Sequence, residues 1–291
     1  MFKTVEKIIK YPRLTQDYPK KMIDSSHFIG KPEIDNRKCT GCGECLRRCP
    51  SNAIVSGSYP GRKITDPVQA AADPAVEGIG AGTAASVSPD IGINYDECVF
   101  CALCEDVCPV GAVKMTSRFE LAEKDRKLLR SDTLVVREGD VPDITGEELN
   151  NRLSKKIRKM FGRSLQIREV DAGSCNGCDY EINALNNPFN DIERLGIHFV
   201  ASPRHADMLL VTGTAVRNME QALLKTYEAA PEPKLVVAVG ACACSGGIFR
   251  DSYAANRGID SLVPVDAYIP GCPPRPQAIL YGILKVLDRV K

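Results

Sequence analysis

The chain contains the segment KCTGCGECLRRCP at residues 38–50 and a similar segment, ECVFCALCEDVCP, at residues 97–109. Both have the pattern C-x-x-C-x-x-C-x-x-x-C-P, and the similarity extends beyond it, because CPSNAI in the first corresponds to CPVGAV in the second. Cysteines three positions apart lie on one short loop, and the proline after the fourth cysteine turns the chain away. The repeat predicts a domain built from two similar halves, each presenting four thiols.

This spacing is typical of bacterial proteins that hold two [4Fe–4S] clusters. A cubane needs soft thiolate ligands that converge on one point, and in this pattern the fourth cysteine of each run binds the cluster of the other run. A structural zinc site is the alternative, but zinc favours two C-x-x-C pairs separated by a longer loop. The pattern therefore predicts two ligand sets, which are Cys39, Cys42, Cys45 and Cys108 for the first cluster and Cys98, Cys101, Cys104 and Cys49 for the second.

The number of cysteines argues against a disulfide-bonded protein. The chain has 291 residues and 13 cysteines, and an odd number cannot all be paired. No apolar run is long enough to span a membrane, and the N-terminus lacks the features of a secretory signal, so we expect a cytoplasmic protein with no transmembrane helix of its own. The 38 basic and 37 acidic residues nearly balance, which gives no reason to expect a nucleic-acid partner.

The composition divides the chain into four parts with one insert. Residues 1–34 form an N-terminal amphipathic segment that packs either on its own domain or on a partner or membrane surface. Residues 35–116 hold both cysteine motifs, and a low-complexity insert rich in Ala, Gly and Pro interrupts them at 67–90, where we expect a surface loop. A charged connector at 117–164 leads to a second domain at 165–291.

The connector is predicted to be helical. FELAEKDRKLLRS (119–131) has a helical composition, and Leu149, Leu153, Ile157 and Phe161 recur every four residues further along. The basic residues around this second stripe indicate either a solvent-exposed helix face or a docking face for an acidic partner or lipid headgroups.

The second domain alternates between strand-like and helix-like segments. The apolar runs at residues 164–170, 196–201, 206–213 and 234–240 read as strands, and the segments at 216–230 and 275–290 have helical length and period. Such alternation predicts a parallel α/β sheet. The remaining cysteines follow predicted strands, at the carboxyl ends where folds of this kind build their sites.

These remaining cysteines form a candidate third site. They occur in DAGSCNGCDYEI (171–182), VVAVGACACSGGIFRDSY (236–253) and VPVDAYIPGCPPRPQAILYG (263–282). Four thiols from three strand ends would enclose another cubane, and the spacing leaves open whether the third of them is Cys242 or Cys244. A redox-active C-x-x-C pair is the alternative, but it leaves the last cysteine unexplained. The candidates are Cys175, Cys178, one of Cys242 or Cys244, and Cys272.

Both halves resemble known families of electron-transfer subunits. The cysteine repeat resembles two-cluster ferredoxins, and with MFKTVEKIIK and FIGKPEI it is similar to the ferredoxin-type subunit of formate hydrogenlyase complexes and to its counterpart in respiratory complex I. The second half, through SPRHAD, GACACSGG and VPVDAYIPGCPPRP, resembles the family of the [NiFe]-hydrogenase small subunit and the complex I subunit that carries the terminal cluster. The implied fold is an α+β two-cluster ferredoxin domain followed by an α/β parallel-sheet domain of flavodoxin-like type.

The resemblance also implies roles for individual residues. Complex I members have adjacent cysteines where this chain has CNGC, the form similar to hydrogenases. The family's third ligand directly follows Gly-Ala, which implies Cys242, and Cys244 then becomes a small buried residue rather than a ligand. Glu181 matches an acidic position near the cluster and is a candidate proton relay, a structural carboxylate or an interface anchor. His205 matches a complex I segment near the quinone pocket. Arg250 flanks a predicted cluster loop and either offsets cluster charge or faces a partner.

By resemblance the chain is a fusion of the ferredoxin-like and small subunits of a membrane-associated group 4 [NiFe] hydrogenase of formate hydrogenlyase type. It would be a non-catalytic electron-transfer subunit of an oxidoreductase, with three [4Fe–4S] clusters. Electrons would enter from a donor module, either formate dehydrogenase-type or ferredoxin, and leave to a [NiFe] site in a large subunit, where protons are reduced to H2. Membrane subunits would hold it on the inner face of the membrane. The alternatives are a subunit of a complex I-like quinone oxidoreductase and a stand-alone soluble electron carrier.

Overall fold

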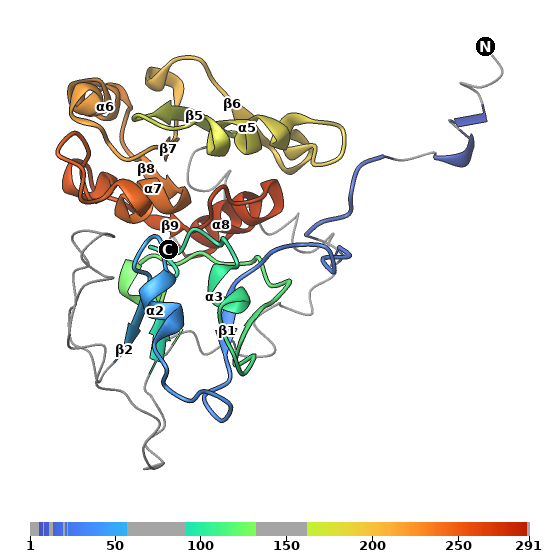
Figure 1. Cartoon of the computed structure of the whole chain (residues 1–291). Helices are drawn as coiled ribbons and strands as arrows, with labels where there is room; N and C mark the ends of the chain where they lie inside the picture. Colours follow the sequence, from blue (N-terminus) through green and yellow to red (C-terminus); the bar gives the residue numbers. More distant parts are fainter. Residues whose placement is uncertain are drawn as a thin grey trace.

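The computed structural model describes the two cysteine-bearing halves of the chain and parts of its N-terminal segment. Figure 1 shows the half with the cysteine repeat lying below the half with the larger sheet. The predicted insert at 67–90 and the predicted apolar stripe between 149 and 161 lie outside the described residues. Those residues are 6–7, 9–11, 14–19, 21, 23–56, 91–131 and 162–289.

The described residues of the first half form two antiparallel strand pairs and two short helices. The strand before the first cysteine motif pairs with the strand after the second, and the strand after the first motif pairs with the strand before the second. This exchange brings the end of each motif next to the start of the other. The elements are β1 (Pro32–Ile34) with β4 (Val113–Met115), β2 (Ile54–Ser56) with β3 (Ile91–Ile93), and the helices α2 (Glu44–Arg48) and α3 (Leu103–Asp106).

The two cysteine loops have the same backbone shape. Gly43 precedes α2 with a φ angle of 72°, and Ala102, at the equivalent position of the repeat, precedes α3 with a φ of 64°. A left-handed conformation costs an ordinary residue about 1–2 kcal/mol, so the loop shape is kept even where the repeat has alanine. The helices α2 and α3 pack against each other. The internal repeat in the sequence is thus a structural repeat.

The second half is a parallel five-stranded sheet, as predicted. The strand order is β6-β5-β7-β8-β9, and every neighbouring pair is parallel. In the register, Ile167 of β5 lies opposite Phe199 of β6 and Met208 of β7. The bounds are β5 (Leu165–Asp171), β6 (Ile197–Phe199), β7 (Met208–Thr212), β8 (Leu235–Val239) and β9 (Ala267–Ile269).

Helices cover both faces of this sheet, which explains the continuous apolar runs of its strands. In β7, Met208 and Leu210 join the core with α5 and α8, whereas Leu209 and Val211 join the core with α6 and α7. The α-helices are α5 (Gly177–Asn183), α6 (Glu220–Ala229), α7 (Gly240–Ser245) and α8 (Pro276–Arg289). Short 3-10 helices are η3 (Arg126–Leu128), η4 (Ala184–Asn186), η5 (Ile192–Leu195), η6 (Pro203–His205), η7 (Arg217–Met219), η8 (Gly247–Phe249) and η9 (Ile259–Ser261).

The two halves share one hydrophobic core. Ile54 and Ile93 of the first half belong to the same buried cluster as Leu209 and Val236 of the parallel sheet. Tyr95, which is 1% exposed, lies in this cluster as well and donates a hydrogen bond of 2.9 Å to the carbonyl oxygen of Pro32. Burial of apolar surface therefore fixes how the cysteine repeat sits against the sheet.

The prediction of a helix at 119–131 is wrong. Glu123 instead forms an antiparallel bridge with Tyr268 of β9, with backbone N–H···O distances of 3.1 and 2.8 Å, and only η3 is helical in this segment. Phe119 and Leu121 are buried. The free edge of β9 has backbone N–H and C=O groups that can pair with another segment. The pairing of Glu123 with this edge outweighs the local preference for a helix. The start of the connector is thus part of the fold.

The N-terminal segment contacts the second half. Gln16 donates its backbone N–H to the carbonyl oxygen of Phe189 at 2.8 Å, and the Tyr18 hydroxyl donates to Glu120 at 2.7 Å. Ile9, on the predicted amphipathic face, is 75% exposed, so this residue does not pack on the rest of the chain. Within the part of the chain that the structure describes, no helix is long and apolar enough to cross a bilayer.

Candidate metal centres

The first predicted ligand set surrounds one cavity. Cys39, Cys42, Cys45 and Cys108 line an open cavity of about 340 Å³ together with apolar side chains such as Val113. Cys108 comes from the second motif and reaches this cavity because β4, which follows it, pairs with β1 ahead of the first motif. The structure therefore brings together the four thiols that the sequence groups, including the one that crosses over.

The second set surrounds an equivalent cavity. Cys49 from the first motif lines a cavity of about 350 Å³ with Cys98, Cys101 and Cys104 from the second. Here the crossing cysteine is positioned by β2, which follows it and pairs with β3. In the described residues, no group of Cys, His, Asp or Glu side chains is arranged to hold a single metal ion. The thiols instead surround a space, as the ligands of a polyatomic cluster do.

Three thiols of these two sites, those of Cys45, Cys98 and Cys104, are costly to ionise without a positive group beside them, whereas backbone hydrogen bonds lower the pKa of Cys108. Burial and the neighbouring thiols raise the pKa of Cys45 to about 11 and that of Cys98 to about 12. The same causes raise the pKa of Cys104 to about 11. Bound iron would offset this cost, because metal binding displaces the thiol protons. The residues present therefore fit a cationic iron–sulfur group.

Backbone N–H groups point at the cysteine sulfurs. Ala53 donates to the Sγ of Cys49 at 3.3 Å, and Ala112 donates to the Sγ of Cys108 at 3.1 Å. Each donor lies four residues after its cysteine, so this contact is repeated in the two halves. Donors to sulfur stabilise thiolate ligands and influence the reduction potential of a cluster.

The third predicted set lies at the carboxyl ends of three strands. Cys175 and Cys178 follow β5, Cys242 follows β8 within α7, and Cys272 follows β9. Burial raises the pKa of Cys178, and the thiols of the other three residues raise it further. Burial also raises the pKa of Cys242 to about 11, again with contributions from Cys272 and Cys175. All four thiols are thus close enough to influence one another.

Backbone contacts hold this third site together. The N–H of Ala241 donates to the carbonyl oxygen of Gly271 at 2.8 Å, which joins the loops that carry Cys242 and Cys272. Gly240 has a φ of 89°, and a β-carbon there would lie 2.5 Å from the Sγ of Cys178. Only glycine fits at such a position.

Cys244 is completely buried, and the Cys178 thiol of the third set is among the charges that raise its pKa. Its side chain is 0% exposed, packs in the core shared by the two halves, and approaches the carbonyl oxygen of Ala238 at 3.8 Å. Burial raises the pKa of its thiol well above the ordinary value. The side chain therefore packs as a small core residue, and the choice of Cys242 rather than Cys244 as a ligand stays a prediction.

The three sites form a series. Among the charges that raise the pKa of Cys45 in the first site is the thiol of Cys104 in the second. Burial raises the pKa of Cys272 in the third site, and the Cys101 thiol of the second site adds to it. Thiols of the second site are therefore close enough to act electrostatically on both the first and the third site.

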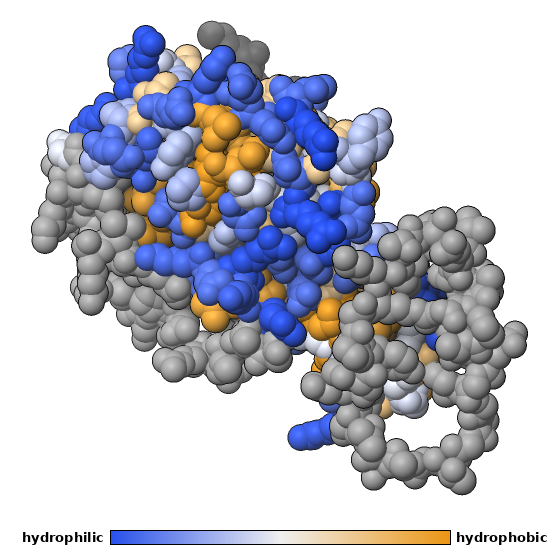
Figure 2. All heavy atoms as spheres, turned by 90° about the vertical axis from the view of Figure 1, so that its left-hand side faces the viewer, coloured by the Kyte–Doolittle hydropathy of each residue, from blue (hydrophilic) through white to orange (hydrophobic). Residues whose placement is uncertain are grey.

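The third site is open to the surface. Cys175 and Cys272 are exposed, and Tyr180, two residues after Cys178, is 77% exposed. Other large hydrophobic side chains on the surface include Ile248, Phe249 and Tyr253. On the face shown in Figure 2, hydrophobic residues form a band bordered by hydrophilic ones.

Of the other residues predicted from the sequence, Glu181 is half-buried on α5, and burial raises its carboxyl pKa while the charge of Arg275 opposes the shift. His205 is exposed at the end of η6. Its neighbour Asp207 is buried and accepts hydrogen bonds from Gln166 and Arg163 at 2.9 and 3.0 Å. The SPRHAD segment thus anchors the start of the sheet.

A carboxyl pair beside the third site was not predicted. Burial raises the pKa of Glu169 to about 7, and its carboxyl shares a hydrogen bond with that of Asp179, whose pKa is lowered by this and other hydrogen bonds despite partial burial. Thr212 donates to Asp179 at 2.6 Å, and Ser174 donates to it as well. The two acids lie ten residues apart, on β5 and on α5, and no sequence motif links acidic residues at this spacing.

Comparison with known proteins places this geometry in a family. Residues 175–286 match the family described as NADH ubiquinone oxidoreductase, 20 Kd subunit, and residues 38–112 match the 4Fe-4S dicluster domain. The probable membrane-bound hydrogenase subunit mbhJ of Pyrococcus furiosus is 45% identical over 150 residues, which cover 50% of this chain and 90% of that protein.

Two further relatives bear different names. Formate hydrogenlyase subunit 7 of Escherichia coli is 47% identical over 144 residues, and the chain spans only 56% of its length. An NADH-quinone oxidoreductase subunit of Geobacter metallireducens is 52% identical over 113 residues, which cover 39% of this chain and 66% of that protein. The chain belongs to the NADH ubiquinone oxidoreductase 20 kDa subunit family of oxidoreductase subunits and carries a 4Fe–4S dicluster domain ahead of the family domain.

Proposed function

We propose that this chain is the electron-transfer subunit of a membrane-associated group 4 [NiFe] hydrogenase of formate hydrogenlyase type. It passes electrons through three [4Fe–4S] clusters to a [NiFe] site in a partner large subunit, where protons are reduced to H2. The observation that carries this proposal is the series of thiols, in which Cys104 neighbours Cys45 and Cys101 neighbours Cys272. A series of sites that ends at an exposed surface suits a relay between two partners.

The proposed ligands are twelve of the thirteen cysteines. Each cluster, when bound, is a one-electron carrier, and the protein holds it by thiolates and donates backbone N–H groups to the sulfurs. The chain itself provides no catalytic residue, and Glu181 is a candidate for moving a proton near the third site. The ligand sets are Cys39, Cys42, Cys45 and Cys108; Cys49, Cys98, Cys101 and Cys104; and Cys175, Cys178, Cys242 and Cys272.

The proposed organisation follows from this relay. The domain at 35–116 receives electrons from a formate dehydrogenase-type module or a ferredoxin, and the domain at 165–291 delivers them, with 117–164 between the two. The large subunit covers the exposed surface around Tyr180 and the third site. Membrane subunits hold the assembly on the inner face of the membrane. Relatives named as subunits of a membrane-bound hydrogenase and of formate hydrogenlyase support this arrangement.

A subunit of a quinone oxidoreductase similar to complex I is the second candidate. The relative named as a subunit of NADH-quinone oxidoreductase favours it, since its identity of 52% over 113 residues is higher than the 45% and 47% of the two relatives named after hydrogenase and formate hydrogenlyase. The spacing of Cys175 and Cys178 argues against it. These two cysteines are three positions apart, whereas the complex I members of the family have adjacent cysteines at this point.

The test is a gentle anaerobic purification of the tagged chain from its source, followed by identification of the co-purifying subunits and a nickel assay. The proposal predicts a large subunit and about one nickel per complex. Quinone-reducing subunits without nickel would support the second candidate. If the chain is recovered alone, and crosslinking in intact cells also captures no other subunit, the chain is a stand-alone electron carrier.

A further inference from the structure

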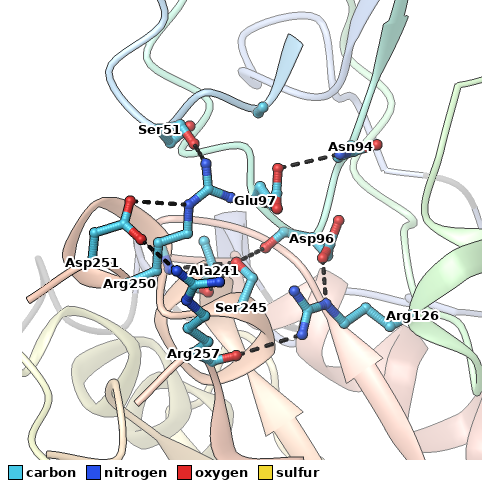
Figure 3. Close-up of polar contacts among 12 residues, drawn as sticks. Ser51, Asn94, Asp96, Glu97, Arg126, Ala241, Ser245, Arg250, Asp251 and Arg257 are labelled. Atoms are coloured by element: carbon cyan, nitrogen blue, oxygen red, sulfur yellow. Dashed lines mark hydrogen bonds and ion pairs between the residues drawn. The ribbon is translucent and has the colours of Figure 1, made fainter. Parts of the chain in front are cut away.

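Arg250 lies at the junction of the two halves. Figure 3 shows its guanidinium reaching from the parallel-sheet half to Ser51 and Glu97 of the other half. One terminal nitrogen, Nη2, donates a hydrogen bond of 2.8 Å to the carbonyl oxygen of Ser51, and the other, Nη1, forms an ion pair with the Glu97 carboxylate. The side chains of Arg250 and Glu97 are only 17% and 16% exposed, so the ion pair is largely shielded from solvent.

The two partners of Arg250 flank ligands of the same site. Ser51 follows Cys49 by two residues, and Glu97 immediately precedes Cys98. Both cysteines line the second cavity, although they come from different cysteine motifs. A single guanidinium therefore holds both chain segments that supply thiols to the second site.

The backbone of Arg250 is connected to the third site. It follows η8, which directly follows the helix that carries Cys242. The N–H of Gly246 donates to the carbonyl oxygen of Cys242 at 2.8 Å, and Ala241 is hydrogen-bonded to Gly271 beside Cys272. Arg250 thus links the loops of the second site to the chain segment that carries Cys242 of the third.

Other contacts secure the same junction without Arg250. The hydroxyl of Ser245 donates to the carbonyl oxygen of Asp96 at 2.7 Å, and the Asp96 carboxylate accepts from Arg126 at 2.6 Å. Figure 3 shows these contacts beside the Arg250 contacts. Because they anchor the chain just before Cys98, a variant that lacks the Arg250 guanidinium should keep a folded junction.

The charge of Arg250 has a direct consequence for the second site. Reduction of a cluster there adds one negative charge close to Glu97, and the carboxylate would oppose it. Arg250 neutralises that carboxylate in an environment where charges are weakly screened by water. The arginine therefore favours the reduced state of the second cluster.

We propose that Arg250 is a positioning residue for electron transfer between the second and third clusters. It fixes the loops of the second site against the parallel-sheet half and cancels the charge of Glu97. One electron leaves the second cluster, which is oxidised, and enters the third, which is reduced, while no bond forms or breaks. This inference rests on the proposed function, because it requires that both sites hold clusters.

The test is a redox titration of the full chain, purified anaerobically with its clusters and followed by electron paramagnetic resonance. The signal of the second cluster is the one lost or altered in Cys98→Ser. At a fixed potential, Arg250→Gln should lower the ratio of reduced to oxidised second cluster about fivefold, and Glu97→Gln should raise it by a similar factor. The double variant Arg250→Gln/Glu97→Gln should return the ratio to within about twofold of the wild type.

Two further variants separate charge from shape. Arg250→Lys keeps the positive charge and should keep the ratio within about twofold of the wild type. Asp251→Asn removes the other carboxylate that pairs with Arg250, at 4.0 Å, and because this side chain is 65% exposed and its charge is screened by water, the ratio should change much less than in Glu97→Gln.

The decisive result is that Arg250→Gln and Glu97→Gln shift the ratio of reduced to oxidised second cluster in opposite directions. A merely structural role of Arg250 predicts a loss of signal with no opposite shift in Glu97→Gln. Shifts of the same sign, or no shift, in a chain that holds the second cluster overturn the inference and leave the proposed function standing. A wild-type chain that lacks the second cluster overturns both.

Discussion

Gly240 lies directly against the sulfur of Cys178, since a β-carbon on Gly240 would be 2.5 Å from that Sγ atom. The glycine begins α7 with a φ of 89°, so the turn into the helix and the space for the thiol depend on the same residue. The helix that carries Cys242 can approach Cys178 only because this position has no side chain.

Gly240→Ala is therefore expected to disrupt the third site alone. The added methyl group displaces the Cys178 thiol, and the iron content should fall by about four atoms per chain from about 12. Gly196→Ala is the matched control, because Gly196 has a similar φ of 74° but a methyl group added there would have no atom within 4 Å. Equal iron contents in Gly240→Ala and the wild type would contradict this description of the site.

The choice between Cys242 and Cys244 as a ligand is testable by substitution. Cys272→Ser and Cys242→Ser should each lose one cluster, or about four irons, whereas Cys244→Ser should keep the wild-type iron content. Cys244 is completely buried, so its replacement should lower stability by about 1 kcal/mol through burial of a hydroxyl in place of a thiol. The ligand choice is wrong if Cys244→Ser loses a cluster and Cys242→Ser does not.

The carboxyl pair of Glu169 and Asp179 predicts a pH-dependent stability. Glu169 keeps its proton in the folded chain up to a pKa of about 7, above the ordinary glutamate value of 4.5, so the folded state binds more protons between these values. The free energy of unfolding contributed by this group therefore decreases as the pH rises from about 4.5 to about 7. Asp179, whose pKa is lowered, titrates below this window.

Glu169→Gln should flatten this dependence. The comparison is urea unfolding of the cluster-containing wild type and variant under anaerobic conditions at several pH values between about 5.5 and about 7.5. The wild type should lose stability across the range, and the variant should lose less. Identical slopes for the two proteins would show that the carboxyl pair does not hold the proton in this way.

Phe119 tests whether the segment after the dicluster domain belongs to the core. Its ring is 7% exposed and lies 5.3 Å from that of Phe28 and 5.9 Å from that of Tyr18, between ring centroids. Phe119→Ala should destabilise the chain by about 3 kcal/mol, measured as a lower urea midpoint. Leu128→Ala, at a side chain that is 42% exposed, should cost well under half as much. Similar midpoints for both variants would mean that this segment is a linker after all.

The sequence predicted what depends on local spacing. Cys108 could be grouped with Cys39 because the C-x-x-C-x-x-C-x-x-x-C-P pattern itself requires an exchange of the fourth cysteine. The strands of the sheet were predictable because their apolar runs are buried on both faces. The sequence also shows that Arg250 flanks a predicted cluster loop. Its partners Ser51 and Glu97, however, lie about 200 and 150 residues away, so their contacts with it depend on how the two halves pack.

Other features depend on tertiary contacts that no local pattern encodes. The segment around Glu123 became extended because it pairs with Tyr268, far along the chain, at the edge of the sheet. The proximity of Glu169 and Asp179 depends on the turn between β5 and α5. In each case the partner residue is fixed only when the sheet and its helices are in place.

Whether the chain holds a series of three cubanes can be measured as the iron and acid-labile sulfide content of the anaerobically purified full chain. Three occupied sites would give about 12 irons and about 12 sulfides per chain, four of each for every site. About eight of each would contradict the proposal of three cubanes, because the third site would then hold no cluster and the series would end inside the dicluster domain.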